Sequence, residues 1–139
     1  MTDDDVQDIK KALKIDDTDL SKNFRELPLL TWQYGDLEAA ANEAANEAKA
    51  TLEHTQAVVS QSVREQFFNV KITEAAVAEK VAMDPDYVMA RSRWVQRDGE
   101  SRRFRAVMEA LRAQKDMLVQ LGANQRQQIQ AGMGDSLRG

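Results

Sequence analysis

The sequence predicts an all-α protein built from long antiparallel helices with coiled-coil-like seams. Only two prolines and six glycines interrupt the 139 residues, while residues that favour helices, such as alanine, glutamate, arginine and leucine, dominate. In two long stretches, apolar residues also recur with alternating spacings of three and four. This spacing is typical of one helix packed against another.

Residues 5–14 form the first predicted helix. Val6, Ile9 and Leu13 share one face at helical spacing, which predicts a short amphipathic helix. Aspartates stand early in the segment and lysines late, which is the order that the helix dipole favours. A turn is expected after this helix.

The second predicted helix spans residues 28–67. The sequence IDDTDL ahead of it offers Asp17, Thr18 or Asp19 as a cap. We place the start of the helix near Pro28, because proline lacks an N–H and restricts the residue before it. Alanine dominates the middle of the seam, where small residues let a neighbouring helix approach closely. The predicted seam comprises Leu27, Leu30, Tyr34, Leu37, Ala41, Ala44, Ala48, Thr51, Thr55, Val58 and Ser62.

Two more helices are predicted further along the chain. Residues 73–83 form a short helix capped by Thr73, and residues 85–121 form a long one capped by Asp84. Pro85 occupies the first position of the long helix, where proline is favoured. The seam of this helix comprises Tyr87, Ala90, Trp94, Arg97, Ser101, Phe104, Met108, Leu111, Lys115 and Leu118.

Residues 1–121 are expected to form a single helical domain. The last helix should be continuous, because its seam keeps the same phase on both sides of Gly99. Residues 122–139 are polar, contain glycine and lack a sustained apolar period, so we expect a flexible tail.

Self-association is expected, because a few long helices would have to bury their seams against partner chains. Arg97 and Lys115 fall on a seam, where an unpaired buried charge is costly. A ring-like homo-oligomer would relieve both charges, at a water-filled lumen or beside the first 60 residues, which carry thirteen acids against six bases. The expected oligomer seam comprises Leu30, Tyr34, Leu37, Tyr87, Trp94, Phe104, Met108, Leu111 and Leu118.

The sequence contains few of the features that an enzyme active site requires. It contains no cysteine, no glycine-rich phosphate loop and no HExxH motif, and its one histidine, His54, has the setting of a solvated or seam-flanking residue. We therefore expect no catalytic residue, no cofactor and no metal site. The lack of cysteine, of a signal sequence and of a long apolar run favours a cytoplasmic protein with no membrane partner.

Arginine is concentrated in the last predicted helix. Residues 87–115 contain eight basic and three acidic residues. Three i,i+4 pairs account for part of this charge, namely Asp98 with Arg102, Arg105 with Glu109, and Arg112 with Asp116. Arg91, Arg93 and Arg97 lie beside Trp94, and Arg103 precedes Phe104. Arginines beside aromatic rings are typical of proteins that bind single strands, although both rings also fit a packing role.

Three motifs carry a resemblance to a known family. IDDTDL before a long helix, KITEAAVAEKVAMDPDYVMARSRW and MEALRAQKDMLVQL resemble the UvsY-type recombination mediators of bacteriophages, over about residues 15–130. The resemblance implies an accessory protein that forms ring-like helical homo-oligomers. It further implies binding to single-stranded DNA and help in loading a RecA-like recombinase onto strands coated by single-strand-binding protein, in the cytoplasm of an infected bacterium.

The chain departs from the family pattern in one respect. The family has a basic run late in its long N-terminal helix, whereas Ala57 and Val59 stand in the corresponding sequence KATLEHTQAVVSQSVREQ. We therefore move the expected DNA contacts to the last helix, with Lys49, Arg64 and Lys71 as lesser contributors. The candidate DNA-binding residues are Arg91, Arg93, Arg97, Arg102, Arg103 and Arg105.

A second hypothesis belongs to a different class. The chain could be a structural helical oligomer, such as a scaffold or virion component, whose arginines are all used in salt bridges. This hypothesis predicts oligomers without DNA affinity, whereas the first predicts affinity that falls steeply with salt.

Overall fold

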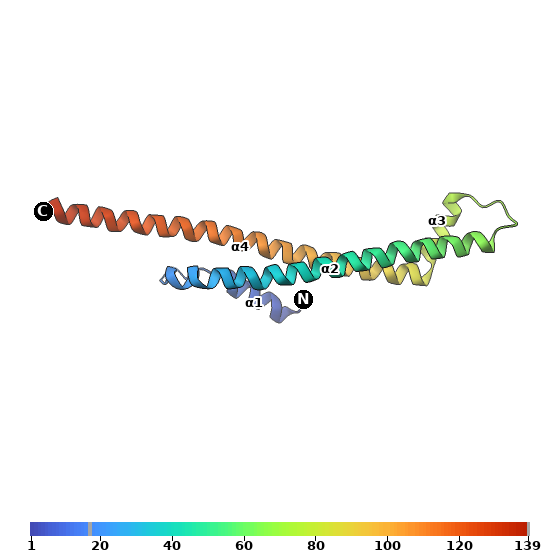
Figure 1. Ribbon diagram of the computed structural model, residues 1–139, viewed down its shortest axis with the longest axis horizontal. Helices are drawn as coiled ribbons and strands as arrows, with labels where there is room; N and C mark the ends of the chain where they lie inside the picture. Colours follow the sequence, from blue (N-terminus) through green and yellow to red (C-terminus); the bar gives the residue numbers. More distant parts are fainter. Residues whose placement is uncertain (17, 139) are drawn as a thin grey trace. The chain divides into compact units, whose positions relative to one another are not determined.

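The computed structural model describes residues 1–16 and 18–138, and the side chains of these residues as far as Met133. The described chain contains four helices and no strand, which confirms the prediction of an all-α protein. The helices are α1 (Asp3–Leu13), α2 (Leu20–Gln66), α3 (Glu74–Met83) and α4 (Pro85–Arg138) (Figure 1).

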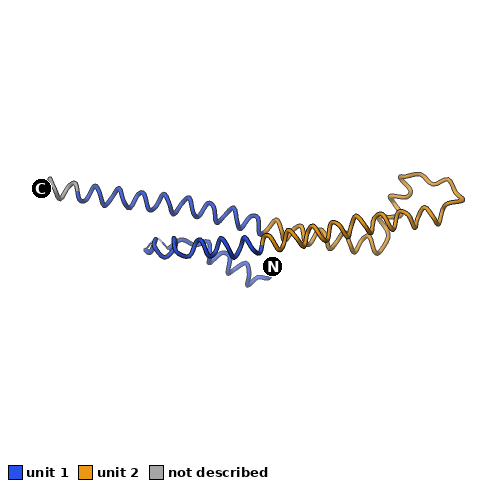
Figure 2. The backbone as a smooth tube through the Cα atoms, viewed as in Figure 1, with its two compact units in different colours: residues 1–37, 104–139 blue, residues 38–103 orange. Residues whose placement is uncertain are grey.

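The contacts of the chain fall into two compact units, where the sequence predicts one domain over residues 1–121. Unit 1 comprises Met1–Leu37 and Phe104–Gly139, and unit 2 comprises Glu38–Arg103 (Figure 2). Both long helices contribute to both units. In each unit, a stretch of α2 packs against a stretch of α4.

Helix α1 begins slightly earlier than predicted because Thr2 caps it. The hydroxyl of Thr2 accepts a hydrogen bond from the backbone N–H of Asp5 at 3.2 Å, and the Asp5 carboxylate accepts one from the N–H of Thr2 at 2.7 Å. This capping box satisfies two N–H groups that would otherwise lack partners. Hydrogen bonds from the backbone N–H of Thr2 and then from its side chain to the carboxylate lower the pKa of Asp5 below its ordinary value.

The turn between α1 and α2 is held by short-range hydrogen bonds. Asp19 caps α2 by accepting from the N–H of Lys22 at 3.0 Å, so it fills one of the predicted cap positions, while Asp17 lies outside the described residues. Asn23 donates to the carbonyl of Asp16 at 2.7 Å and to that of Asp19 at 3.2 Å. The turn is therefore fixed by the first residues of α2 themselves.

Helix α2 begins at Leu20, ahead of the start predicted near Pro28. The Asp19 cap and the packing of Leu20 and Leu27 in the core of unit 1 stabilise this early turn, so that Pro28 lies inside the helix. Proline in a helix interior removes one backbone hydrogen bond, that to the carbonyl four residues earlier. Local packing here outweighs the preference of proline for a helix start.

Unit 1 contains a core of large aliphatic side chains from three helices. Leu118 has no exposed surface, and Leu111 is almost fully buried beside it. The side-chain amide of Gln114 donates to the carbonyl of Ala12 at 3.3 Å and so ties α4 to α1. The buried cluster comprises Leu27, Val107, Leu111 and Leu118, with Ile9, Leu13, Ile15, Leu20, Leu30, Tyr34 and Met108 partly buried against it.

Unit 2 is packed with smaller residues. Ala45 and Ala48 are the buried residues in the middle of α2, and the hydroxyl of Ser101 on α4 donates to the side-chain oxygen of Asn42. Near α3, a cluster of valines closes the unit. It comprises Val59, Val63, Val77 and Val81, with Phe67, Ile72 and Tyr87 partly buried against it.

The predicted caps of α3 and α4 are present. Thr73 accepts from the N–H of Ala76 at 3.1 Å, and Asp84 accepts from the N–H groups of Asp86 at 2.9 Å and Tyr87 at 3.3 Å. Both helices therefore begin within one residue of the predicted position.

The second half of the α2 seam is shifted by one residue from the prediction. Val59 and Val63 are buried, whereas Val58 and Ser62, the predicted positions, are exposed. A straight helix drifts by about 20° per heptad relative to a strict seven-residue repeat. Over the roughly five heptads that follow Leu27, this drift reaches about 100°, which is the angle between successive residues.

The prediction that Arg97 and Lys115 lie on the seam of α4 is wrong. Both side chains are exposed, and the buried positions near them are Ser101 and Gln114. In unit 1 the buried face of α4 is wider than a two-helix seam, because α1 contacts it through Gln114. Because neither charge is buried, neither requires a ring to relieve it.

Helix α4 also continues beyond Leu121, where the sequence predicts a flexible tail from residue 122. The helix runs to Arg138, and Gly122 lies within it. A Cβ atom at Gly122 would lie 3.7 Å from the ring of Phe24, so this turn still packs against α2. Glutamine, alanine and arginine favour the helix beyond that point.

Candidate nucleic-acid interface

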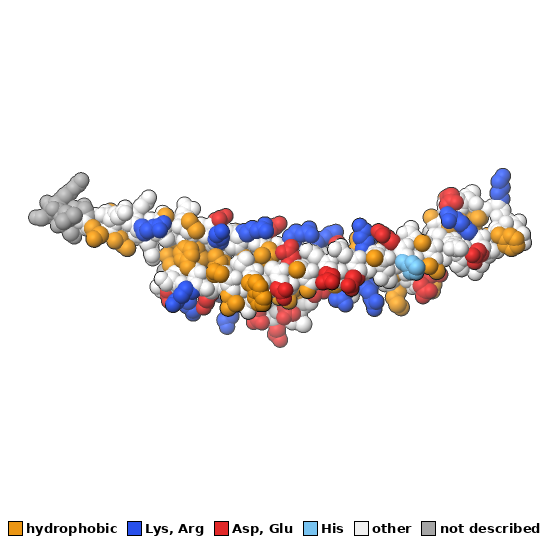
Figure 3. Space-filling model, viewed as in Figure 1, with side chains coloured by type: hydrophobic (Ala, Val, Ile, Leu, Met, Phe, Trp, Pro, Cys, Tyr) orange, Lys and Arg blue, Asp and Glu red, His pale blue; other side chains and the backbone are white. Residues whose placement is uncertain are grey.

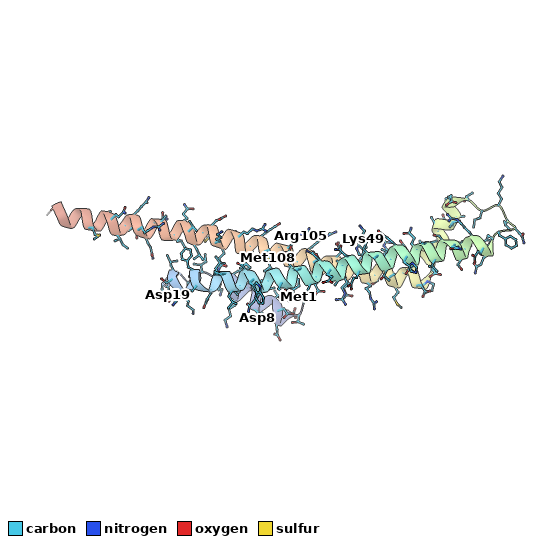
Figure 4. The ribbon with its side chains drawn as sticks, viewed as in Figure 1. Met1, Asp8, Asp19, Lys49, Arg105 and Met108 are labelled. Atoms are coloured by element: carbon cyan, nitrogen blue, oxygen red, sulfur yellow. The ribbon has the colours of Figure 1, made fainter. Side chains whose placement is uncertain are left out.

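The six candidate arginines all lie on α4 and are all exposed. Five of them belong to unit 2, whereas Arg105 belongs to unit 1. Figure 3 shows basic side chains recurring along α4, and Figure 4 labels Arg105 on this helix. The five in unit 2 are Arg91, Arg93, Arg97, Arg102 and Arg103.

Two of these arginines are engaged in ion pairs. Arg102 lies 2.7 Å from Asp98, as the i,i+4 spacing predicts, and Arg97 lies 3.7 Å from Glu100. Exposed helical pairs of this kind contribute only about 0.3–0.5 kcal/mol each. Each pair therefore adds little stability, but it places a carboxylate beside the positive charge of each arginine.

Four arginines take part in no ion pair within the described residues, namely Arg91, Arg93, Arg103 and Arg105. The predicted partner of Arg105, Glu109, is not within ion-pair distance of it. The same holds for the predicted pair of Arg112 and Asp116. The structure therefore leaves more unneutralised positive charge on α4 than the spacing of acids and bases predicts.

The unpaired arginines of unit 2 do not form one cluster. Arg91 borders a hollow of about 320 Å³ with Tyr87 and Val95, whereas Arg93 borders one of about 380 Å³ between α2 and α4. Successive helical residues are about 100° apart, so Arg91 and Arg93 occupy different flanks of α4 and Arg103 lies between them on the outer side. A bound strand would have to cross the helix or wrap around it.

The aromatic residues beside these arginines are not placed to stack on bases. Phe104 is only 9% exposed, and Trp94 is half-buried. The prediction that these rings pack within the protein is the better of the two interpretations. Binding through α4 would therefore depend on charge, because the base-stacking term of about 1–3 kcal/mol per base would be missing.

The lesser candidates differ in their surroundings. Arg64 forms an ion pair with Glu74 at 2.9 Å, whereas Lys49 and Lys71 are exposed. A contact that the sequence did not indicate is that of Lys80 with the ring of Phe67, whose centroid lies 4.7 Å from the ammonium nitrogen. The side chains of all three lesser candidates are exposed, and Lys49 and Lys71 form no ion pair within the described residues.

All residues of the predicted oligomer seam except Leu37 are buried or partly buried within a single chain. Leu111, Leu118 and Phe104 are buried, and Leu37 is 45% exposed. The remaining members are partly buried: Leu30, Tyr34 and Met108 against the core of unit 1, Tyr87 against the valine cluster, and Trp94 on α4. Their burial therefore does not require a second chain.

The titratable groups with shifted pKa values belong to caps and packing. The Thr18 hydroxyl, followed by its backbone N–H, lowers the pKa of Asp16 by donating hydrogen bonds to its carboxylate. Burial, together with the nearby charges of Asp8 and Asp5, raises the pKa of Tyr34. Within the residues that the structure describes, no group of three or more histidine or acidic side chains could hold a metal ion.

Two buried polar side chains were not predicted from the sequence. Asn23 and Gln114 are each more than nine-tenths buried. The position of Gln114 could have been predicted, because it lies three residues after Leu111 and four before Leu118, at the spacing of core residues. A polar residue at such a position is a candidate for a specific contact.

No described helix combines the length and the apolar character that crossing a membrane requires. Comparison with known proteins found no match, since no protein-family model fits the sequence and no curated protein or solved structure is significantly similar to it. The resemblance to UvsY-type mediators stays a prediction from the three motifs.

Proposed function

We propose that the protein binds single-stranded DNA through the arginines of α4 and acts, as a homo-oligomer, as a phage recombination mediator. In this proposal it helps to load a RecA-like recombinase onto strands that are coated by single-strand-binding protein. The observation that supports it best is the exposure of Arg91, Arg93 and Arg103 in unit 2, none of which forms an ion pair within the described residues. The three sequence motifs supply the mediator role.

DNA binding through arginine charge, without stacking of bases on aromatic rings, has measurable consequences. Binding should be insensitive to base sequence, because arginines that contact phosphates do not read bases. On single strands, each phosphate contact contributes about 0.7 to the slope of log affinity against log salt, so three contacts give a slope of about −2 per protomer. An oligomer would combine many such weak sites into one strong one.

The direct test measures fluorescence anisotropy of a labelled oligonucleotide across a salt series. The variant replaces Arg91, Arg93 and Arg103 together by alanine. Its matched control replaces Arg64, Arg97 and Arg102, which also removes three charges from unit 2 but takes them from ion pairs. We expect the first variant to lose at least tenfold in affinity and most of the salt slope, and the control to lose clearly less.

Two outcomes would count against this assignment. Equal losses in both variants would show that net charge alone drives binding, and unchanged affinity in the first would exclude these arginines as the site. Light scattering on each variant checks that the mass of the assembly is unchanged. A second measurement, the rate at which a RecA-like recombinase assembles on coated strands, tests the mediator role in the same variants.

The alternative of a structural helical scaffold is favoured by a different observation. Arg64, Arg97 and Arg102 are used in ion pairs, as that hypothesis expects of every arginine. It predicts a concentration-dependent mass together with no change in anisotropy at low salt. The anisotropy series therefore separates the two functions directly.

A further inference from the structure

The turn between α2 and α3, residues 67–73, carries two large apolar side chains in solvent. Phe68 is 78% exposed, more than any other aromatic side chain that the structure describes, and Val70 is 62% exposed. Figure 1 shows this turn as the loop that leads from the end of α2 to α3. The turn therefore presents the face of an aromatic ring to solvent.

The neighbours of Phe68 fix the turn to the rest of unit 2. Phe67 and Ile72 are partly buried against the valine cluster, and the backbone N–H of Val70 donates to the carbonyl of Phe67 at 3.0 Å. Because the residue before it packs inward, Phe68 is held on the outside of the turn. A ring that is already held in place loses little freedom when it binds a ligand.

The charges around the turn are balanced. Arg64 forms an ion pair with Glu74 at 2.9 Å, and the ammonium group of Lys80 lies over the ring of Phe67. The other charged side chains between residues 64 and 80 are all exposed, namely Glu65, Lys71 and Glu79. With three acids and three bases, the turn offers an aromatic ring but no net charge.

The arginines of α4 have the complementary property, charge without an accessible ring. Arg91, Arg93 and Arg103 belong to the same unit as the turn and form no ion pair within the described residues. The rings beside them in the sequence, Trp94 and Phe104, are partly or almost fully buried. Proteins that bind single strands combine cations for the phosphates with rings for the bases. Unit 2 therefore contains both parts, on different elements.

The turn lies further along the helix pair that carries the arginines. Asn42 of α2 contacts Ser101 of α4, and from this contact α2 continues toward α3 while α4 leads back to it. At about 1.5 Å per residue, the end of α2 lies about 20 Å beyond Arg91 along the pair. A stacked strand rises about 3.4 Å per nucleotide, so about six nucleotides cover this distance.

We propose that Phe68 is a stacking residue for single-stranded nucleic acid. One base of the strand lies against the ring, while phosphates further along the same strand contact the arginines of α4. This inference rests on the proposed function and adds to it the aromatic contact that α4 lacks. Because a ring stacks on any base, it brings no dependence on base sequence.

The size of the exposed apolar group favours a base over a larger partner. An aromatic side chain buries about 150–250 Å². A stable contact between two protein chains buries at least about 1,200 Å² in total. One ring and one valine fall well short of that area, whereas a single base needs only one face of one ring.

The first test measures the fluorescence anisotropy of a labelled oligonucleotide with Phe68→Ala. We expect affinity to fall about tenfold, because the stacking of one base is lost. Phe68→Trp keeps a ring and should keep the affinity. Val70→Ala removes the other exposed apolar side chain of the turn and should leave affinity unchanged. Equal affinity of Phe68→Ala and the unmodified chain, or an equal loss in Val70→Ala, would overturn the proposal.

The second test separates the base from the backbone. On a strand of the same length that lacks bases, Phe68→Ala should bind as tightly as the unmodified chain, because only phosphates and sugars remain. On the normal strand, Phe68→Ala should lower affinity by the same factor at every salt concentration, whereas the arginine variant should reduce the salt slope. A tenfold loss on the strand without bases would show that the ring does not act by stacking. Circular dichroism checks that the helices are intact.

The third test follows the ring itself. With Trp32→Phe and Trp94→Phe in place, Phe68→Trp creates the only tryptophan of the chain. Its emission should be quenched when the normal strand binds and should stay unchanged with the strand that lacks bases. Unchanged emission during binding of the normal strand would place the bases elsewhere.

The outcomes distinguish this inference from the proposed function. Binding that depends on the arginines but not on Phe68 would overturn the inference alone, whereas no binding by the unmodified chain would overturn both. Phe68→Ala is also compared with the unmodified chain in light scattering and in sedimentation with vesicles of phosphatidylserine and phosphatidylcholine. A loss of mass or of vesicle binding, with affinity for the strand intact, would overturn the inference and assign the turn to a second copy or to a lipid surface.

Discussion

Unit 1 and unit 2 use the same two long helices but pack them with different side chains. The core of unit 1 is formed by leucines from α2 and α4 and is covered by α1, whereas the middle of unit 2 is formed by alanines and one Ser101–Asn42 hydrogen bond. Each buried methylene contributes about 0.8 kcal/mol, so a leucine contact stabilises by roughly 2 kcal/mol more than an alanine contact.

This difference in packing indicates that the two units have different roles, one in stability and the other in carrying surface charge. Unit 1 carries the most deeply buried residues, and unit 2 carries five of the six candidate arginines. A helix pair with an alanine interior needs close approach of the backbones but few large side chains. Its outer faces are then free to carry charge.

The largest expected effect comes from the leucine core. Leu118→Ala should lower the free energy of unfolding by about 2–5 kcal/mol, because Leu118 is fully buried and its removal leaves a cavity. Chemical denaturation followed by circular dichroism measures the change. The control is Val119→Ala, whose side chain is half exposed and should cost well under 1 kcal/mol. A similar small loss for Leu118→Ala would mean that unit 1 is not the stable part.

In the alanine interior of unit 2, adding side-chain volume should be destabilising, whereas in unit 1 removing it should be. Ala45→Leu should destabilise by about 1–3 kcal/mol, because the added carbons have no space in the buried middle of α2. Ala50→Leu, at an exposed position of the same helix, is the matched control. Denaturation by urea measures both variants. Greater stability of Ala45→Leu would show that the helices of unit 2 are not closely packed.

The smallest effect concerns the turn at the start of unit 1. Because the pKa of Asp16 is lowered by its bonds to Thr18, the bonded turn is favoured above the ordinary value of 3.8 and is lost as pH falls through the lower folded value. We expect the resonance of the Thr18 amide to differ between Asp16→Asn and the unmodified chain at neutral pH, and this difference to shrink below pH 3.8.

Nuclear magnetic resonance of the Thr18 amide measures this change. Thr18→Val keeps the carboxylate but removes the hydroxyl donor at 2.5 Å, so the pKa of Asp16 should move back toward its ordinary value. An unchanged titration in Thr18→Val would show that the hydroxyl does not set it.

Much of the fold could be predicted from local patterns. The caps at Thr73 and Asp84 and the continuous helix across Gly99 follow from residues close together in the sequence. The start of α2 and the far end of α4 could not be predicted in this way. Packing of Leu20 in the core and of Phe24 against Gly122 depends on residues about a hundred positions away, which no local pattern reveals.

The candidate site was predicted less completely. Exposure of the arginines follows from their charge, but their pairing depends on rotamers that spacing does not fix, so Asp98–Arg102 forms and Arg105–Glu109 does not. Spacing placed Arg97 on the seam because it lies seven residues before the buried Phe104, but its charged side chain is exposed and pairs with Glu100. That the side-chain oxygen of Gln114 lacks a hydrogen-bond partner could be seen only in the structure.

Three contacts between segments distant in the sequence are nested, and this has a consequence for the order of folding. Arg64 and Glu74 are ten residues apart, Asn42 and Ser101 are 59 apart, and Ala12 and Gln114 are 102 apart, each pair enclosing the one before. Loop closure costs least for the shortest loop. We therefore expect α2 and α4 to pair first near α3 and then progressively toward unit 1. The leucine core, although the most buried part, would then form last.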